Sequence, residues 1–502
     1  MYTLAWFKSH YKILLAGIVI WSLAVRVIGL SAPKDYVFDE VYHAVTAKLI
    51  ARDDVRAYEW WNDPVEPNTA VDWLHPPLAK YSQAGFIKLF GETPFAWRLS
   101  AALFGTLVIL LTAKLAYALT QDELISLMAA LLASFDGLLL TQSRIAMNDI
   151  HVTAGIVGAA YCYIRFRALQ SSDQLFPQPK ARKWWWLAFF TAGLALASKW
   201  SGLFVVVWLG GWEFQRTALW LLQQKKHQIN TLIKWLVAGF GTMVLLPALI
   251  YVASYSHMFL QGKSLVCFGD QLKQGVCYCD QTSSWWVTAL KTVNPANSLK
   301  WEQLEARGGC KRLLSHFSEL HKQIWWYQTN LTATHGYQSR PWQWFLNLKP
   351  VWFHVTYAPN GRVGNIYAQG NPALFWIGDI AVVASVIWLF VMISRKKIPS
   401  EWTRSAQLVS LYFVVWLPWQ FSPRIMFFYH YTPAVPFLSI ILAWWLGKSL
   451  RLKPQPAWAR GLVLSVILVC ALAFVLWYPH WTDWPVEKTW AKTWYFSIPS
   501  WQ

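Results

Sequence analysis

The sequence predicts an all-α, polytopic membrane protein with about eleven transmembrane helices. Of its 502 residues, 56% are hydrophobic and 14% are charged, which is too apolar for a soluble enzyme of this size. Apolar runs recur along the chain, and Lys and Arg gather in alternate connections between them. The net charge of +19 does not indicate a nucleic-acid partner, because the basic residues form no compact basic domain.

Each apolar run is interpreted as membrane helix. The runs lie at 13–30, 97–119, 124–142, 150–164, 184–222, 232–254, 372–393, 406–421, 425–447 and 461–478. The first contains Arg26 and lacks a small-residue cleavage site behind it, so we interpret it as a retained span rather than a signal peptide. The run at 184–222 is about twice the roughly 20 residues that one span needs, and the segment 198–202 interrupts it. It therefore predicts two helices with Lys199 at the turn between them.

The positive-inside rule gives the orientation of these spans. With a cytoplasmic N-terminus, the inner connections collect the basic clusters at 8–12, 165–183, 216–226, 395–404 and 448–460. A single membrane domain, 1–502, then has three extracytoplasmic parts: 31–96, 255–371 and the tail 479–502. We expect a cell-membrane protein with its functional residues on this outer side.

Ionisable residues gather at the outer ends of the predicted spans. They are Asp39, Glu40, His75, Arg98, Arg144, Asp149, Lys199 and Arg424. Desolvation is costly at such positions, so ionisable side chains there usually serve a function. Any one of them is explained as well by snorkelling into the lipid headgroups, but the set on one side favours a site.

Several of these residues belong to an ordered series of motifs. The series comprises Phe38-Asp39-Glu40, the segment DWLHPPLAK at 72–80, Trp97-Arg98-Leu99, Thr141-Gln142-Ser143-Arg144, Ser198-Lys199-Trp200-Ser201-Gly202, the segment SRPWQW at 339–344 and FYHYTPA at 428–434. In order and spacing it resembles the protein O-mannosyltransferase family. The loop 255–371 is too short for the large extra domain of eukaryotic members, so the resemblance is to the compact bacterial form.

The resemblance implies a type C glycosyltransferase (GT-C) architecture. It implies a reaction in which mannose passes, with inversion, from polyprenyl-phosphate-mannose to a Ser or Thr hydroxyl of an exported acceptor protein. Besides this lipid, the acceptor and membrane lipids, the resemblance calls for no cofactor and no metal. The neighbouring carboxylates of Asp39 and Glu40 also fall short of the six or so oxygens that Mg²⁺ or Ca²⁺ prefers.

Asp39 is the predicted catalytic base, because a hydroxyl nucleophile must lose its proton as the new bond forms. The alternative is that Asp39 caps the helix that follows it. Glu40, grouped with Asp39 as a catalytic residue, is expected to point elsewhere, since adjacent side chains on a helix do not share a face, and to orient either a partner or the acceptor backbone. Lys199, Arg144 and Arg98 are the predicted ligands of the donor phosphate.

Further predictions concern substrate contacts and the outer loop. His75, Asp149 and Trp342 are predicted substrate-binding residues; a structural bend at His75 and interfacial anchoring by Trp342 are the alternatives. In an oxidising compartment, disulfides could join Cys267, Cys277, Cys279 and Cys310 in any of three pairings.

Two other function classes stay open. A related GT-C enzyme would move a polyprenyl-linked sugar to a lipid such as lipid A, but it should lack the motifs around Arg144 and Lys199. A transporter would show paired halves with broken helices in matching positions, and no internal repeat is visible.

Overall fold

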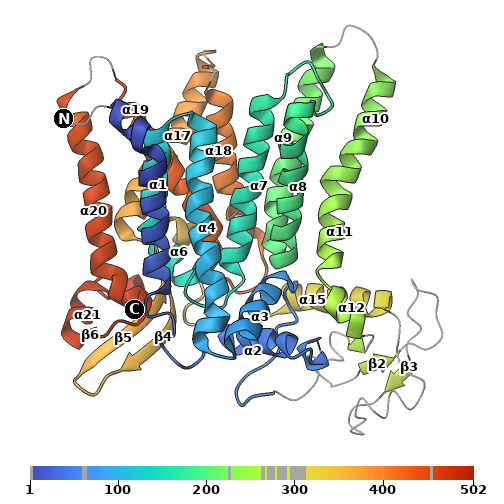
Figure 1. Ribbon diagram of the computed structural model, residues 1–502, viewed down its shortest axis with the longest axis vertical. Helices are drawn as coiled ribbons and strands as arrows, with labels where there is room; N and C mark the ends of the chain where they lie inside the picture. Colours follow the sequence, from blue (N-terminus) through green and yellow to red (C-terminus); the bar gives the residue numbers. More distant parts are fainter. Residues whose placement is uncertain are drawn as a thin grey trace.

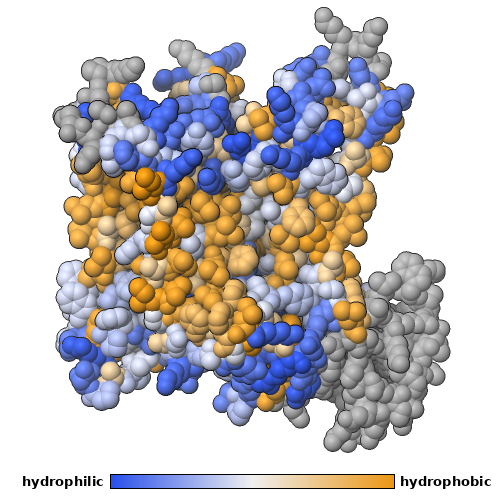
Figure 2. All heavy atoms as spheres, viewed as in Figure 1, coloured by the Kyte–Doolittle hydropathy of each residue, from blue (hydrophilic) through white to orange (hydrophobic). Residues whose placement is uncertain are grey.

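The computed structural model is a bundle of long helices with a polar layer at each end (Figure 1). It describes residues 4–58, 65–223, 228–261, 266–267, 277–279, 291–293, 313–396, 398–399, 401–452 and 456–501. Figure 2 shows an apolar band across the middle of one face of the molecule, between two more hydrophilic ends. This distribution is that of a protein whose middle is surrounded by lipid tails.

A helix occupies each predicted apolar run. The bundle contains α1 (Leu4–Val27), α4 (Pro94–Thr120), α5 (Glu123–Ser134), α7 (Asp149–Leu169), α8 (Pro179–Ser198), α9 (Leu203–Gln223), α10 (Ile229–Phe240), α11 (Leu246–Ala253), α17 (Pro372–Ser394), α18 (Trp402–Val414), α19 (Val435–Ser449) and α20 (Ala457–Thr482). Within the described residues, five helices are long and apolar enough to cross a membrane by themselves: Trp6–Val27, Pro94–Thr120, Ile229–Ser254, Pro372–Ser394 and Trp458–Thr482. The total of eleven crossings stays a prediction.

The predicted break at Lys199 is confirmed. Helix α8 ends at Ser198, a short 3-10 turn, η2 (Trp200–Gly202), follows, and α9 begins at Leu203. Lys199 itself has an extended backbone, which cannot continue either helix. A Cβ on Gly202 would lie 2.3 Å from the backbone carbon of Ala195, so only glycine fits this close approach.

The run at 124–142 differs from the prediction because it is divided by Asp136. Helix α5 ends at Ser134, and Asp136 is the N-cap of α6 (Gly137–Gln142), where its carboxylate accepts from the Leu139 backbone N–H at 2.7 Å. The second carboxylate oxygen of Asp136 accepts at 3.0 Å from the backbone N–H of Asn371, and Asn371 is the N-cap of α17. One buried acid therefore fixes two helix starts next to each other.

One end of the molecule carries the segments that connect the helices on the predicted outer side; we call it the site end, and it is the lower end in Figure 1. Its short helices are η1 (Val55–Tyr58), α2 (Glu40–Ala51), α3 (Leu78–Phe90), α12 (Ser256–Gln261), α15 (Leu313–Asn330), α16 (Pro341–Phe345), η5 (Leu417–Phe421), η6 (Phe428–Ala434), α21 (Lys488–Trp494) and η7 (Pro499–Trp501). The N-terminus lies at the opposite end from the C-terminus, as the predicted topology requires (Figure 1).

The all-α prediction omitted two small antiparallel sheets. One consists of β4 (Val351–Tyr357), β5 (Arg362–Ala368) and β6 (Val486–Glu487), in the order β4-β5-β6; the other of β1 (Val266–Cys267), β2 (Cys277–Cys279) and β3 (Lys291–Val293). Strand β5 is buried along most of its length because it packs against α20 and α6. Pairing of Val363 with Val486 brings the C-terminal tail onto the long outer loop.

Three of the outer cysteines lie in the small sheet of β1 to β3, where Cys267 is the antiparallel partner of Cys277 and Cys279 ends β2. Cys310 lies outside the described residues, so the predicted disulfides of the outer loop stay a prediction. Among the described residues, Cys162 and Cys470 are free and buried in the bundle.

Candidate active site

The site end brings Asp39, Asp149 and Lys199 into one cluster. Asp39 precedes α2 at the N-cap position, but its side chain makes no capping hydrogen bond. Its carboxylate is partly buried and lies within electrostatic range of Lys199 and His43. Burial raises the pKa of Asp39 to about 6, although His43 and Lys199 act in the opposite direction. The side chain of Asp39 therefore does not cap α2, which was the alternative role for this residue.

The residue before Asp39 has an unusual backbone. Phe38 has a φ of 51°, in the left-handed region that bulky side chains rarely adopt. Its ring stacks on Phe353 of β4, with centroids 4.3 Å apart, and lies edge-on to Tyr429 of η6 at 5.8 Å. These contacts hold the strained turn that presents Asp39 to the cluster.

Glu40 points away from Asp39, as its position on the helix predicts. Its two oxygens accept from Nε and Nη2 of Arg98, each at 2.8 Å, and from the backbone N–H groups of Val37 and Ala146, each at 2.9 Å. Both side chains of the pair are fully buried. Glu40 thus orients a partner, and that partner is Arg98.

Arg98 has no donor left for a phosphate in this structure. Its remaining N–H groups donate to the backbone oxygens of Leu30, Pro33 and Asp35 at 2.8 to 3.2 Å. The pair therefore fastens the segment after α1 to the start of α4. This geometry departs from the phosphate role predicted for Arg98.

Arg144 is used in a similar way at the end of α1. Its Nη1 donates to the backbone oxygens of Val25, Arg26 and Ile28, and its Nη2 donates to that of Gly29, at 2.8 to 3.1 Å. A helix leaves its last carbonyls without internal partners, and a guanidinium satisfies them well. Arg144 is therefore a C-terminal cap of α1, and its guanidinium is not joined to the Lys199 cluster.

Lys199 is the predicted phosphate ligand that lies beside Asp39. Its ammonium donates to both oxygens of Asp149, at 2.7 and 2.9 Å, and lies 5.5 Å from the ring centre of Tyr429. Both members of the pair are buried. Asp149 is the first residue of α7, so a helix N-terminus also supports its negative charge.

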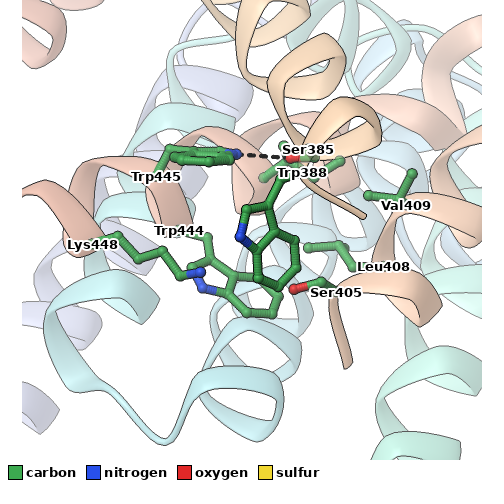
Figure 3. A pocket seen from close by; sticks show the side chains of 9 residues that line it. Ser385, Trp388, Ser405, Leu408, Val409, Trp444, Trp445 and Lys448 are labelled. Atoms are coloured by element: carbon green, nitrogen blue, oxygen red, sulfur yellow. Dashed lines mark hydrogen bonds between the residues drawn. The ribbon is translucent and has the colours of Figure 1, made fainter. Parts of the chain in front are cut away.

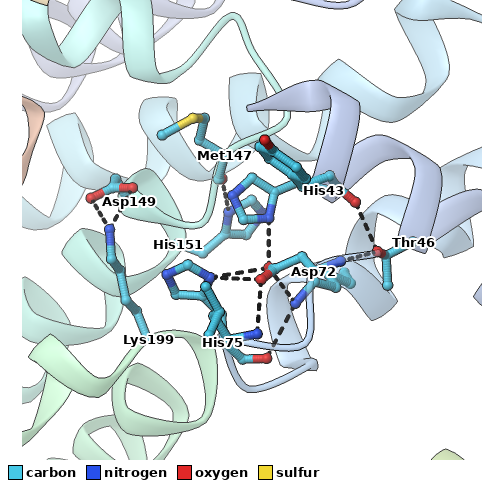
Figure 4. A network of polar contacts seen from close by, with 11 residues as sticks. His43, Thr46, Asp72, His75, Met147, Asp149, His151 and Lys199 are labelled. Atoms are coloured by element: carbon cyan, nitrogen blue, oxygen red, sulfur yellow. Dashed lines mark hydrogen bonds and ion pairs between the residues drawn. The ribbon is translucent and has the colours of Figure 1, made fainter. Parts of the chain in front are cut away.

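A second polar network, centred on Asp72, adjoins this pair (Figure 4). The buried carboxylate of Asp72 lies 2.8 Å from Nδ1 of His43, 2.9 Å from Nδ1 of His75 and 2.7 Å from Nζ of Lys80. His75 thus lies next to the Lys199–Asp149 pair, and its role in binding substrate stays a prediction. His43 and Asp72 were not among the predicted site residues, although His43 follows Asp39 by one helical turn and Asp72 begins the motif that contains His75.

In the described part of the chain, this network is also the group of side chains whose types and spacing could suit a metal ion. The ligand atoms of His43, Asp72 and His75 lie within 4.8 Å of one another. The ammonium of Lys80 already pairs with the same carboxylate, so a divalent cation would meet an adjacent positive charge. We interpret the group as a hydrogen-bond network.

The remaining predicted residue, Trp342, lies apart from this cluster. It is on α16 and is 56% exposed. Next to α16, a cavity of about 310 Å³ is lined by residues 331–334, 338–340, 343 and 423–426, including Arg340 and Arg424 but not Trp342. The cavity is wide enough for part of a ligand and carries positive charge.

A small pocket elsewhere in the bundle does not belong to the site. Lys448, in the last turn of α19, lies beside Trp388, Trp444 and Trp445 (Figure 3). Its ammonium also pairs with Glu401 at 2.7 Å. The other lining residues are apolar or Ser. A lysine among tryptophans at the end of a membrane helix is typical of interfacial anchoring.

Solved structures of other proteins have a similar fold. The protein O-mannosyltransferase Pmt1-Pmt2 complex of S. cerevisiae, bound to its sugar donor, matches with a TM-score of 0.72 and 16% identity over 98% of this chain and 92% of the other. ArnT from Cupriavidus metallidurans, bound to undecaprenyl phosphate, matches with a TM-score of 0.52 and 13% identity over 94% and 77% of the chains. The fold is that of the type C glycosyltransferases, which are membrane enzymes.

Sequence comparison then identifies the family. Residues 17–260 match the family "Dolichyl-phosphate-mannose-protein mannosyltransferase", and residues 313–498 match "C-terminal four TMM region of protein-O-mannosyltransferase". A "Polyprenol-phosphate-mannose--protein mannosyltransferase" of Corynebacterium glutamicum is 27% identical, covering 93% of this chain and 92% of its own. The chain belongs to the protein O-mannosyltransferase family, as its motifs predict.

Proposed function

We propose that this protein transfers mannose from polyprenyl-phosphate-mannose to Ser or Thr hydroxyls of exported proteins, with inversion of the anomeric carbon. Membership of the family supports the reaction, and the name of the Corynebacterium relative states the same donor and a protein acceptor. One structural observation carries the proposal. The carboxylate of Asp39 makes no capping hydrogen bond and lies within electrostatic range of the buried Lys199–Asp149 pair.

In this reaction, the acceptor oxygen forms a bond to C1 of mannose while the bond between C1 and the phosphate oxygen breaks. Asp39 takes the proton of the hydroxyl, so the departing carrier phosphate leaves with one additional negative charge. A base works best when its pKa lies near the working pH, and burial brings that of Asp39 to about 6. The carboxylate is then mostly ionised at neutral pH and still basic enough to accept the proton.

The departing phosphate needs fixed positive charge, and we assign Lys199 to this role. Arg424 is the second cation that we include. It is partly exposed in the wall of the 310 Å³ cavity, and Tyr429 lies within electrostatic range of both Arg424 and Asp39. Arg98 and Arg144 are left out, because backbone oxygens and Glu40 already occupy their guanidinium groups.

We place the site on the extracytoplasmic side of the cell membrane. The basic clusters between the predicted spans favour a cytoplasmic N-terminus, and the site end lies opposite the N-terminus (Figure 1). An acceptor that has been exported as an unfolded chain would reach Asp39 from this side.

Transfer of the sugar to a lipid is the second candidate function, since the fold is also similar to that of ArnT. The higher TM-score with the protein O-mannosyltransferase complex, 0.72 against 0.52, and the family match both favour a protein acceptor. Purified protein in detergent with polyprenyl-phosphate-mannose should glycosylate a Ser/Thr peptide. Transfer to lipid A with none to peptide would reverse the choice, and no transfer to either would overturn the proposal.

A further inference from the structure

Asp72 is held as a carboxylate that accepts hydrogen bonds from several directions. Although burial raises its pKa, the nearby His75, Lys80 and His43 together lower it well below the usual value. Its backbone N–H also donates to Oγ1 of Thr46 at 2.8 Å, which fixes this residue against α2. An ionised carboxylate can only accept, so the facing ring nitrogen of His75 must carry the proton.

This contact determines which nitrogen of His75 is free. Nδ1 lies 2.9 and 3.1 Å from the two oxygens of Asp72 and donates to them. Burial lowers the pKa of His75 to about 4, so the ring is neutral near pH 7 and holds one proton. Its other nitrogen, Nε2, then has a lone pair and no hydrogen, and can only accept.

The ring of His75 lies between Asp72 and the Lys199–Asp149 pair (Figure 4). It is partly exposed, with a side-chain exposure of 24%, whereas Asp72 is almost inaccessible. His75 also lies within electrostatic range of Lys199. A substrate bound at Lys199 and Asp39 would therefore lie close to this ring.

An accepting nitrogen selects its ligand by chemistry. A phosphate oxygen carries lone pairs and negative charge, so it would repel Nε2, whereas a hydroxyl donates a hydrogen bond to it. We propose that Asp72 is a positioning residue that holds His75 as a neutral imidazole, and that Nε2 of His75 accepts a hydrogen bond from a substrate hydroxyl. This inference rests on the proposed function, which supplies two sources of hydroxyl: the transferred sugar and the acceptor side chain.

Two substitutions of His75 separate this role from a structural one. In His75→Asn the amide takes the place of Nδ1 and retains the bond to Asp72, but nothing replaces Nε2. In His75→Gln the amide reaches the place of Nε2 and supplies an accepting oxygen there. We expect His75→Asn to raise the KM of one substrate by about twofold to tenfold, the worth of one neutral hydrogen bond, and His75→Gln to restore most of the loss.

Binding measurements identify the source of the hydroxyl. Radiolabelled polyprenyl-phosphate-mannose and sugar-free polyprenyl phosphate are bound to the full-length protein in detergent. If the hydroxyl is on the sugar, His75→Asn weakens binding of the first lipid and leaves that of the second unchanged. If it is on the acceptor, both lipids bind normally and only the peptide KM rises.

Other results would overturn the inference. Equal losses in His75→Asn and His75→Gln would show that the ring only supports the fold, and equal weakening of both lipids would show a phosphate contact. No effect of His75→Asn on either substrate would also refute it. Failure of the unmodified protein to bind the mannose donor would instead refute the proposed function, so the two failures are distinguishable.

Discussion

At the residue scale, two neighbouring acids have opposite environments. Asp39 is partly exposed and has no capping partner, while Glu40 is fully buried and holds Arg98 with two hydrogen bonds. The left-handed turn at Phe38 and the start of α2 together separate the two side chains. Only the first is free to take a proton from a substrate.

Replacing each acid by its amide tests this division. Asp39→Asn should fold normally, because no hydrogen bond of the side chain is lost, yet reduce transfer by roughly a hundredfold to ten-thousandfold. Glu40→Gln should instead lower stability by about 3 kcal/mol or more, because Arg98 would lose its buried countercharge. Turnover per folded molecule and thermal unfolding in detergent are measured for both. Normal transfer in Asp39→Asn with none in well-folded Glu40→Gln would reverse the assignment.

The raised pKa of Asp39 predicts the acidic limb of the pH profile. The base must be ionised, so kcat/KM should fall by about tenfold per unit as the pH drops below about 6. Above that value the carboxylate is already formed and the rate should level off. The residual activity of Asp39→Asn, measured over the same range, should lack this limb. A limb that persists there belongs to another group.

Lys199 makes the third test at this scale. Lys199→Ala should lower turnover by about a hundredfold or more, since a fixed cation is lost where negative charge develops. It also leaves the buried Asp149 unpaired, so the double variant Lys199→Ala, Asp149→Asn is the control. Recovery of transfer in the double variant would mean that Lys199 serves only to neutralise Asp149.

At the element scale, buried cations hold helix ends in place. Arg144 satisfies four backbone oxygens at the end of α1, and Arg98 fastens the following segment through three more. The end of α1 and the segment that follows it lead directly into the turn at Phe38. The position of Asp39 therefore depends on two residues that do not face the site.

Arg144→Ala should accordingly act on stability. Hydrogen bonds to a charged group are worth roughly 1.5 to 3 kcal/mol each, so we expect a loss of at least about 2 kcal/mol and a clearly lower unfolding temperature. Arg144→Lys keeps the charge but has fewer donors, so its unfolding temperature should lie between those of the unmodified protein and Arg144→Ala. Unfolding in detergent is followed by tryptophan fluorescence. An unchanged unfolding temperature with lost transfer would support the phosphate role predicted from the sequence.

At the scale of the whole molecule, the site lies at one end of a bundle whose face in Figure 2 carries an apolar band across its middle. The β-hairpin of β4 and β5, the C-terminal tail and the segment before α2 meet at this end. The site is thus assembled from parts of the chain that are hundreds of residues apart, and its sidedness determines which substrates reach it.

Cysteine labelling from outside the cell tests that sidedness. In a background without the native cysteines, Asn360→Cys and Thr489→Cys, both exposed at the site end, should react with a membrane-impermeant maleimide. Lys396→Cys, exposed beyond the end of α17, should react only after the membrane is opened. Labelling of position 396 alone in intact cells would invert the topology.

The sequence by itself determined the helical membrane class, the family and the break at Lys199. These follow from apolar length, motif order and the segment 198–202 that interrupts a run of double length, all of which are local properties of the chain. It also predicted that Asp39 and Glu40 diverge, because neighbours on a helix never share a face.

Only the tertiary structure decided what each buried charge touches. A basic residue at the end of a membrane helix needs an anionic or carbonyl partner. The sequence shows that such a residue is present, but it does not show which partner it contacts. Arg98 and Arg144 find Glu40 and backbone oxygens, whereas Lys199 finds Asp149 beside the site. The His43–Asp72–His75 network and the buried strand β5 could not be predicted either, because contacts between distant segments leave no periodic signal in the sequence.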